Sequence, residues 1–303
     1  MQTRSLGRTG LEATVVGFGA LTIGGAFGTV DDAVSIDALH AAIDAGMNFI
    51  DTSDAYGAGH SEHLIGNFLK QRADRDRIIV CTKGGNNMVT GERNFTSDYI
   101  RGCVEGSLTR LGIEAIDVYL LHNPSLDNLK AEDSFEVLET FVTQGKIKYW
   151  GVSVNTLAEC EYTVASGQPA VMQMEYNLLE QAPEAVFAKA HAAGIGVIAR
   201  VPLKRGMLSG RFNEETTFEA ADLRGRILSA DKMPAYVNKV RQIEAAAASV
   251  WRPLAEIAMR FCISNPHVAV TIPEIRTPEQ ARSNAAACEP LPADIVEALR
   301  QLA

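Results

Sequence analysis

Short runs of β-branched and other apolar residues alternate along the chain with longer segments that carry an apolar residue every three or four positions. The short runs are typical of buried strands and the longer segments of amphipathic helices. Eight strands are predicted, at 14–19, 48–52, 78–83, 117–122, 149–154, 171–176, 196–201 and 268–273. Amphipathic helices are predicted near 32–45, 61–71, 97–111, 133–144, 156–166, 183–193, 234–263 and 292–302.

Several predicted helices have residues at their ends that favour starting or stopping a helix. Side chains suited to N-cap positions stand at Ser61, at Thr96 or Ser97, and at Thr156. Gly46 and Gly194 each precede a predicted strand, where a left-handed residue would end the helix before it.

The order of these elements predicts a (β/α)8 barrel. Regular alternation of apolar strands and helices indicates a parallel sheet covered by helices, and eight such units in 303 residues favour a closed barrel over an open sheet. Turn residues Gly7 and Gly10 predict a hairpin that caps the barrel floor before the first strand. The connection between strands seven and eight is the longest, and its charged part, 204–233, is expected to lie over the barrel top as a loop. No break in composition divides the chain, so we expect one domain over 1–303.

Composition narrows the classes of partner. The net charge is -9, which argues against a nucleic-acid or anionic-membrane partner and leaves a small molecule as the expected one. No apolar stretch is long enough to span a membrane, and the first residues lack the apolar core of a signal peptide, so a cytoplasmic protein is expected. The pattern does not predict an oligomeric state.

The cysteines do not suggest a framework of disulfides. Their number is odd, their spacing is wide, and they are Cys81, Cys103, Cys160, Cys262 and Cys288. Because no Cys-x-x-Cys pair occurs, we expect reduced thiols and no zinc site built on cysteine. His60 and His63 share a predicted helix face, but no third ligand is suggested, so no metal is predicted.

Polar and titratable side chains stand at the carboxyl ends of the predicted strands, which meet at one mouth in a barrel. They are Asp51 at the end of strand two and Tyr56 after it, Lys83 at the end of strand three, His122 at the end of strand four, Ser153 at the end of strand five and Asn155 after it, and Gln173 in strand six. A buried lysine needs a partner, and Asp51 on the neighbouring strand is the expected one.

This set of groups suits carbonyl reduction. A positive charge at Lys83 is expected to push the pKa of Tyr56 below about 10, so that the phenol can give a proton to a developing alkoxide. His122 can donate a hydrogen bond to the same oxygen. Acyl transfer is disfavoured, because we expect no nucleophilic serine or cysteine beside His122. Lys83 alone also fits a structural ion pair or a Schiff-base lyase.

Eight stretches occur in order between residues 17 and 284, within a resemblance that runs from about residue 3 to residue 290: GFGALTIGG, FIDTSDAYGAGHSEHLIG, CTKGG, DVYLLHNP, GKIKYWGVSVN, QMEYNLLEQ, PLKRGMLSGRF and IPEIRTPEQARSN. Together they resemble the aldo-keto reductases of bacterial type. The resemblance implies a (β/α)8 barrel that binds NADP(H), less often NAD(H), without a Rossmann fold. Gly17 and Gly19 lack the third glycine of a Rossmann fingerprint, since Thr22 stands there, and Gly19 is expected to let the first strand pass close to the cofactor.

The resemblance also implies roles for individual residues. The catalytic group would be Asp51, Tyr56, Lys83 and His122. The nicotinamide carboxamide would be held by Ser153, Asn155 and Gln173. The pyrophosphate would lie along Pro202, Leu203, Lys204, Gly206, Leu208, Gly210 and Arg211. The adenosine end would meet Glu274, Arg276, Gln280 and Asn284. Substrate-pocket candidates in the loops are Leu21, Phe27, Met88 and Asn123.

Two positions depart from the family pattern. Arg200 stands where an aromatic residue usually stacks on the nicotinamide, and its charge should favour the neutral reduced ring. Glu274 replaces a common Gly or Lys, so it would repel a 2′-phosphate and accept hydrogen bonds from a free ribose 2′-hydroxyl, whereas Arg276 could clamp the phosphate. NADPH/NADP+ is the expected cofactor, with NADH/NAD+ open because of Glu274.

The function expected from the sequence is reduction of an aldehyde or ketone, with Tyr56 as general acid. Three alternatives stay open. They are an NAD-dependent aldose dehydrogenase that works oxidatively, a non-catalytic barrel that senses the cofactor, and a Schiff-base lyase at Lys83.

Overall fold

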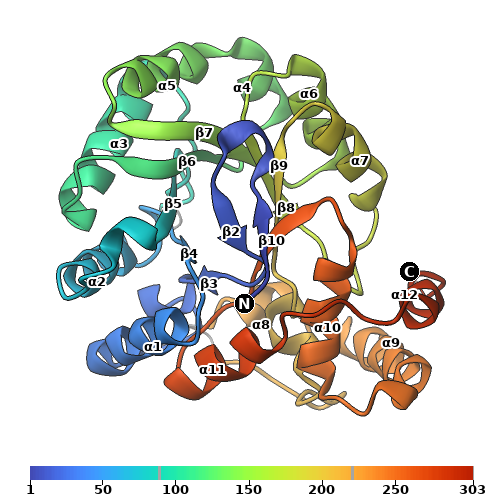
Figure 1. Ribbon diagram of the computed structural model, residues 1–303. Coiled ribbons are helices and arrows are strands. Elements are labelled where there is room, and N and C mark those ends of the chain that lie inside the picture. Colours follow the sequence, from blue (N-terminus) through green and yellow to red (C-terminus); the bar gives the residue numbers. More distant parts are fainter. Residues whose placement is uncertain (88–89, 220–221, 303) are drawn as a thin grey trace.

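A ring of eight parallel strands forms the centre of the computed structural model, which describes residues 1–87, 90–219 and 222–302 (Figure 1). The strands are β3 (Phe18–Gly19), β4 (Phe49–Asp51), β5 (Ile79–Gly84), β6 (Ile116–His122), β7 (Ile147–Ser153), β8 (Val171–Glu175), β9 (Gly196–Arg200) and β10 (Val268–Ile272). Parallel bridges Val16–Thr271 and Gly19–Glu274 join the two ends of this sheet. The predicted (β/α)8 barrel is therefore confirmed.

The N-terminal hairpin closes one end of the barrel, as predicted. Its strands β1 (Thr3–Ser5) and β2 (Glu12–Thr14) pair antiparallel and lie across the ring in Figure 1. Leu6 and Ala13 of the hairpin belong to the same buried cluster as Phe49 and Val118 inside the barrel. Burying these apolar side chains stabilises the hairpin against the floor.

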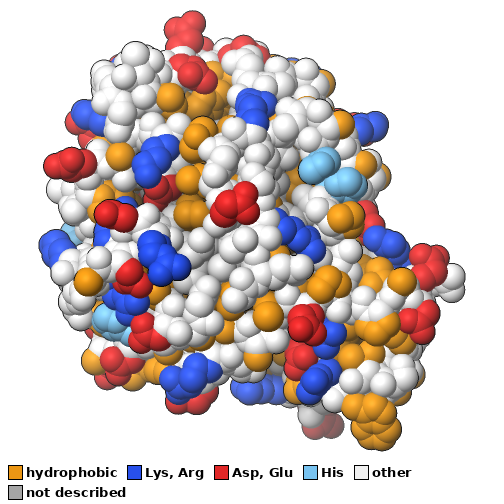
Figure 2. Space-filling model, in the orientation of Figure 1, with side chains coloured by type: hydrophobic (Ala, Val, Ile, Leu, Met, Phe, Trp, Pro, Cys, Tyr) orange, Lys and Arg blue, Asp and Glu red, His pale blue; other side chains and the backbone are white. Residues whose placement is uncertain are grey.

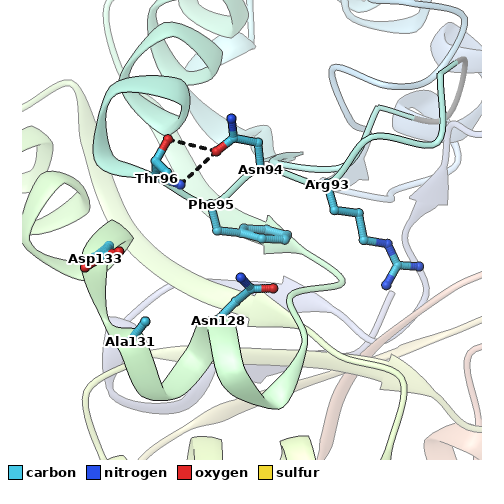
Figure 3. Close-up of a pocket in the computed structure, with 7 residues that line it drawn as sticks. All are labelled: Arg93, Asn94, Phe95, Thr96, Asn128, Ala131 and Asp133. Carbon is cyan, nitrogen blue, oxygen red and sulfur yellow. Dashed lines mark hydrogen bonds between the residues drawn. The ribbon is translucent and has the colours of Figure 1, made fainter.

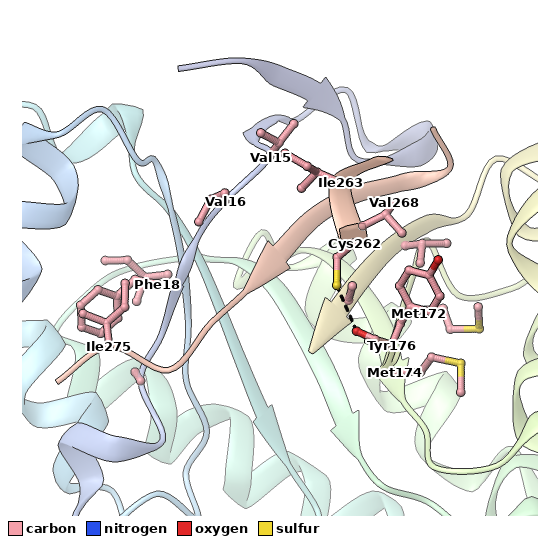
Figure 4. Close-up of a cluster of buried hydrophobic side chains, with 14 of the residues drawn as sticks. Val15, Val16, Phe18, Met172, Met174, Tyr176, Cys262, Ile263, Val268 and Ile275 are labelled. Carbon is pink, nitrogen blue, oxygen red and sulfur yellow. Dashed lines mark hydrogen bonds between the residues drawn. The ribbon is translucent and has the colours of Figure 1, made fainter. Parts of the chain in front are cut away.

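Helices surround the strands and enclose a second, larger apolar core. They are α1 (Asp32–Asp44), α2 (His60–Leu69), α3 (Ser97–Leu111), α4 (Leu126–Ala131), α5 (Asp133–Thr143), α6 (Leu157–Ser166), α7 (Glu184–Ala192), α8 (Arg224–Ile227), α9 (Met233–Ala246), α10 (Leu254–Ser264), α11 (Pro278–Ala286) and α12 (Ala293–Arg300). In Figure 4, Cys262 of α10 donates its thiol to the carbonyl of Tyr176, which follows β8. This contact joins α10 to the segment that follows β8.

Two predicted elements are divided in the structure. The strand expected at 14–19 splits, because Thr14 pairs within the hairpin and β3 is only Phe18–Gly19, with Val16 bridged to Thr271 before it. The helix expected at 234–263 is two helices, α9 and α10, separated around Pro253. Proline has no N–H to donate and disfavours a helical residue before it, so the helix cannot continue through this point.

The predicted helix starts have different outcomes. Thr156 is confirmed as an N-cap, since its hydroxyl accepts from Glu159 N and the Glu159 carboxylate accepts from the backbone N–H of Thr156. Ser61 is wrong as an N-cap, because α2 begins after the left-handed Gly59. The Ser61 hydroxyl instead donates to the carbonyl of Ala20, which ties α2 to the loop after β3. The helices α4, α8 and α11 were not predicted.

The face of the molecule in Figure 2 mixes acidic and basic side chains, and neither sign forms an extended patch there. In the described ranges, no helix is both long and apolar enough to cross a membrane. All five cysteines are free thiols.

Candidate active site

A buried ion pair lies at the carboxyl ends of β4 and β5. The ammonium of Lys83 donates to Asp51 Oδ1 at 2.6 Å, to the carbonyl of Thr52 at 2.7 Å and to Tyr56 Oη at 3.2 Å. Lys83 is 1% exposed and Asp51 is 3% exposed. All three ammonium protons therefore have acceptors, which is the condition for keeping a buried lysine charged. The predicted pairing of Asp51 with Lys83 is confirmed.

The strand register brings further polar side chains beside this ion pair. Cα pairing aligns His122 with Ser153 and Ser153 with Gln173 across β6, β7 and β8. Gln173 Nε2 donates to the second oxygen of Asp51 at 2.7 Å, and Ser153 Oγ donates to Gln173 Oε1 at 3.0 Å. Two of the residues expected to hold a carboxamide thus form one chain with Asp51.

Tyr56 lies in the turn between β4 and α2 and is half-buried. The loop after β3 packs against its backbone, since a Cβ at Gly24 would lie 2.8 Å from the carbonyl carbon of Tyr56. Burial raises the pKa of Tyr56 to about 12, against the opposing effect of the Lys83 charge. The expected net lowering of this pKa is wrong, because desolvation of the phenolate outweighs the neighbouring ammonium. Tyr56 is a protonated phenol at neutral pH.

His122 ends β6 and is buried beside Tyr56, with the two rings edge to face and their centroids 5.9 Å apart. Burial, followed by the charges of Lys83, Arg200 and Arg93, holds the pKa of His122 well below its usual value. The imidazole is therefore neutral at neutral pH, with a proton on only one of its nitrogens. Its Nδ1 lies 3.0 Å from Ser53 Oγ, so the expectation that no serine lies beside His122 is wrong. Ser53 is completely buried, so its hydroxyl is not open to a substrate.

Three cations converge on one carboxylate at the ends of β8 and β9. The carboxylate of Glu175 lies 2.6 Å from Lys204 Nζ, 3.5 Å from Arg205 Nη1 and 3.8 Å from Arg200 Nη1. The second guanidinium nitrogen of Arg200 donates to Asn155 Oδ1 at 2.8 Å. Positive charge therefore exceeds negative charge here, and Asn155 lies against Arg200 instead of joining the chain at Asp51. Glu175 was not singled out from the sequence, although a charged residue at a strand end was a usable signal.

The backbone of the loop after β9 is strained. Val201 (φ 57°), Lys204 (φ 45°) and Arg205 (φ 55°) adopt left-handed conformations, and Gly206 follows with φ 93°. Such values are unfavourable for residues with a Cβ and worst for a β-branched one. The short 3-10 helix Lys204–Ser209 lies in this segment. Pro202 and Leu208 are buried, Leu203 is half-buried, and Gly210 and Arg211 after the helix are exposed.

The segment after β10 contacts the loop after β3. Glu274 Oε2 accepts from the backbone N–H of Thr22 at 3.3 Å, and burial, followed by the charge of Asp51, raises the pKa of Glu274 to about 7. Arg276 donates to the carbonyls of Phe27 and Thr29, and its own N–H donates to Gln280 Oε1 at 2.8 Å. Glu274 thus faces the ion pair, with Arg276 at the outer side of the same turn. Asn284 is buried in α11.

Gly19 is needed for close packing between the first and last barrel strands. A Cβ at this position would lie 2.8 Å from the carbonyl oxygen of Pro273.

The substrate-pocket candidates lie at different places. Asn123 follows His122 with φ 59°, and its Oδ1 is buried without a hydrogen-bond partner among the described residues. The ring of Phe27 lies under the Arg224 guanidinium, 4.9 Å from it. Leu21 begins the turn that meets Glu274. Met88 lies outside the described residues.

Two cavities lie near these loops. One of about 190 Å³ is lined by Arg93, Asn94, Phe95, Thr96, Asn128, Ala131 and Asp133. Figure 3 shows Phe95 close to Asn128, with the Arg93 side chain directed away from both. The other, of about 240 Å³, is lined by Asn155, Leu157, Met174, Glu175, Glu180, Ala182, Pro183 and Arg200. Neither includes the ion pair in its walls.

The imidazole of His60 contacts an acidic side chain of α1. Its Nε2 lies 2.8 Å from Asp32 Oδ1. Within the part of the chain that the structure describes, no three His, Cys, Asp or Glu side chains are grouped to hold a metal ion.

The aldo/keto reductase family matches residues 15–303. Aldo-keto reductase YhdN of Bacillus subtilis strain 168 is 32% identical over 287 residues, which are 92% of this chain and 86% of that protein. The holo form of aldo-keto reductase AKR11C1 from Bacillus halodurans has a TM-score of 0.85 and 26% identity, with 100% and 96% of the two chains covered. Glycerol dehydrogenase AKR11B4 from Gluconobacter oxydans has a TM-score of 0.85 and 27% identity, with 99% and 94% covered.

The fold and these similarities define an oxidoreductase that uses a nicotinamide cofactor in carbonyl chemistry. The chain belongs to the aldo/keto reductase family.

Proposed function

We propose that this protein reduces an aldehyde or ketone to an alcohol, with Tyr56 as the proton donor. The observation that carries this proposal is the contact of 3.2 Å between Tyr56 Oη and Lys83 Nζ, beside a neutral His122. A phenol, an ammonium and an imidazole at one mouth supply a proton, a charge to stabilise the resulting phenolate, and a hydrogen-bond donor for the substrate oxygen.

The residues present fit a dinucleotide with a pyrophosphate. Arg200 Nε is buried and has no hydrogen-bond partner among the described residues, and Lys204 and Arg205 add positive charge beside it. Arg200 would lie at the nicotinamide, Ser153 and Gln173 at its carboxamide, and the 202–211 loop along the phosphates. When bound, the nicotinamide supplies the hydride.

In the reaction, Tyr56 gives its proton to the oxygen of the substrate carbonyl. Lys83 stabilises the phenolate that results, and Asp51 and the Thr52 carbonyl hold Lys83 in place. His122 donates a hydrogen bond that orients the carbonyl. Reduction starts from the phenol and oxidation from the phenolate, and the raised pKa of Tyr56 keeps the phenol form at neutral pH.

A Schiff base at Lys83 has less support, because it needs a neutral amine. The three hydrogen bonds and the Asp51 charge keep this amine protonated, and the pKa of Lys83 is raised above its ordinary value. Alcohol oxidation is the second candidate, favoured by the similarity to a glycerol dehydrogenase.

Isotope transfer tests the proposed reaction. The protein is incubated with a panel of aldehydes, ketones and sugars, and with NADPH that carries two deuterium atoms at nicotinamide C4. We expect the alcohol product to contain one deuterium on the former carbonyl carbon, measured by mass spectrometry. Oxidation of glycerol or sugars with NADP+ or NAD+, without any carbonyl reduction, would favour the second candidate. No transfer in either direction would contradict both.

For the cofactor we propose NADPH. Glu274 accepts from Thr22 N and interacts with Asp51, so its carboxylate lies on the side of the ion pair. Arg276, held by the carbonyls of Phe27 and Thr29, supplies the positive charge for a 2′-phosphate at the outer side of the same turn. Arg276→Ala should weaken NADPH binding by about tenfold or more, because hydrogen bonds to charged groups contribute about 1.5–3 kcal/mol. NADH binding should change little, and fluorescence titration measures both dissociation constants.

Arg276→Lys is the matched variant, since it keeps the charge without the planar fork, and it should lose less NADPH affinity than Arg276→Ala. Tighter binding of NADH than of NADPH by the unaltered protein would instead assign the ribose 2′-hydroxyl to Glu274.

A further inference from the structure

We propose that Ser53 and Asp54 form a positioning relay that determines which imidazole nitrogen of His122 carries the proton. The inference rests on the proposed function, in which His122 must donate from Nε2 to the substrate oxygen. Neither residue belongs to the catalytic group implied by the family resemblance.

The relay is a continuous set of short contacts behind His122. Ser53 Oγ lies 3.0 Å from His122 Nδ1 and 3.2 Å from Asp54 Oδ1. It also lies 3.2 Å from the carbonyl of Lys83 and accepts the N–H of Ala55 at 3.2 Å. Ser53 is completely buried, so water cannot replace these partners.

Counting protons shows why the state of Asp54 matters. The Ser53 hydroxyl has one proton to donate, and the Ala55 N–H already occupies one of its two lone pairs. When Asp54 is ionised, the carboxylate draws the serine proton, because a charge-assisted hydrogen bond is the stronger one. The other lone pair of Ser53 then accepts a proton from His122 Nδ1, which leaves Nε2 as an acceptor.

Protonation of Asp54 reverses the chain. The carboxyl group then donates to Ser53 Oγ, and the serine proton turns to His122 Nδ1, which at 3.0 Å is nearer than the Lys83 carbonyl at 3.2 Å. The imidazole must carry its proton on Nε2, which is the donor that a carbonyl oxygen requires. Burial and the charges of Lys83, Arg200 and Arg93 keep the ring neutral. A neutral imidazole carries its proton on Nδ1 or on Nε2, but not on both.

The surroundings of Asp54 allow this change near neutral pH. Burial and the negative charge of Glu62 on α2 raise the pKa of Asp54 to about 6, although Cys103, Ser53 and Arg110 oppose them. Tyr99, which like Cys103 is on α3, and Tyr119 of β6 also interact with Asp54. Gly84 leaves room for this cluster, since a Cβ there would lie 3.0 Å from Asp54 Oδ2 and 2.1 Å from Tyr119 Oη.

The sign of the pH effect follows. Below about pH 6 Asp54 is protonated and His122 presents an Nε2 proton to the substrate, and above it the proton moves to Nδ1. The hydrogen bond from His122 to the substrate carbonyl should therefore be lost as the pH rises through about 6, and kcat/KM should fall. Losing one neutral hydrogen bond corresponds to about a fivefold fall in kcat/KM.

The tautomer of His122 is measured directly by ¹⁵N NMR of the full-length protein with ¹⁵N-labelled histidine, between pH 5 and pH 8. The signals are assigned by comparison with His122→Asn. We expect Nε2–H below about pH 6 and a growing Nδ1–H population above it. Asp54→Asn should keep Nε2–H throughout, because its amide can donate to Ser53 at every pH. A tautomer that does not change with pH in the unaltered protein would overturn the relay, whether or not the protein reduces carbonyls.

Kinetics provides the second readout. Asp54→Asn should remove the fall in kcat/KM near pH 6, and Ser53→Ala should remove it in either Asp54 background, because Asp54 acts through Ser53. Ser53→Thr keeps the hydroxyl and should restore the fall. Asp117→Asn is the matched control, since Asp117 is a buried carboxylate at the opposite end of β6, paired with Lys148. The relay would be contradicted if the fall in kcat/KM near pH 6 persisted in Asp54→Asn, or if it disappeared in Asp117→Asn.

Discussion

Replacement of Tyr56 by phenylalanine is expected to lower kcat for carbonyl reduction by about 10²–10⁴-fold, which is the usual contribution of a positioned general acid. The ring and its edge-to-face contact with His122 would remain, and only the hydroxyl that meets Lys83 would be lost. Since the 202–211 loop and the β10–α11 turn are untouched, the dissociation constant for NADPH should stay within about twofold. Steady-state kinetics and fluorescence titration measure the two quantities.

A matched control is Tyr162→Phe, which removes a phenol hydroxyl on α6 that donates to Glu132 at 3.1 Å. This variant should keep the kcat of the unaltered protein. If Tyr56→Phe kept more than about a tenth of kcat, the proton would have to come from another group, and the assignment of Tyr56 would fail.

The second large effect concerns the Asp51–Lys83 pair. Asp51→Leu should lower the free energy of unfolding by about 3–5 kcal/mol, because it leaves a buried ammonium without its counter-charge. Adding Lys83→Met removes that charge and should recover most of the loss, although Gln173 would still lack the acceptor it has in Asp51. Urea unfolding followed by circular dichroism gives both values.

Activity should not follow stability in this pair of variants. Both should be inactive, because neither retains an ammonium fixed beside Tyr56. An Asp51→Leu protein as stable as the unaltered one would mean that Lys83 finds another partner or loses its proton. Activity recovered in the double variant would remove Lys83 from the mechanism.

The sequence predicts the barrel and the ion pair because both depend on local patterns. Strand and helix periodicities are visible residue by residue, and adjacent parallel strands place Asp51 and Lys83 at the same end. Pro253 is equally visible within the predicted helix 234–263, and a proline inside a helical pattern indicates the break that the structure has between α9 and α10.

Other features depend on distances that only the folded chain sets. The pKa of Tyr56 is raised because the effect of burial is larger than the effect of the Lys83 charge, and the extent of burial cannot be predicted from the sequence. Glu175 meets Arg200 through the β8–β9 register and meets Lys204 and Arg205 through the loop after β9. Ser53 reaches His122 because a turn after β4 meets the end of β6. The roles given to the catalytic and cofactor residues stay predictions until the variants are measured.

The surplus positive charge around Glu175 sits in a molecule whose net charge is -9. A doubly or triply charged anion approaching from solution therefore meets two opposing fields. At separations of several Debye lengths, each about 10 Å in 0.1 M salt, both interactions with the anion are screened. At low salt the repulsion by the net negative charge of the molecule reaches further and acts on the anion first. Only close to the mouth does the attraction of Arg200, Lys204 and Arg205 prevail. Salt therefore has opposite effects on two quantities. It raises the association rate of such a ligand by screening the overall repulsion, and it weakens the binding of the ligand at the mouth by screening the local attraction.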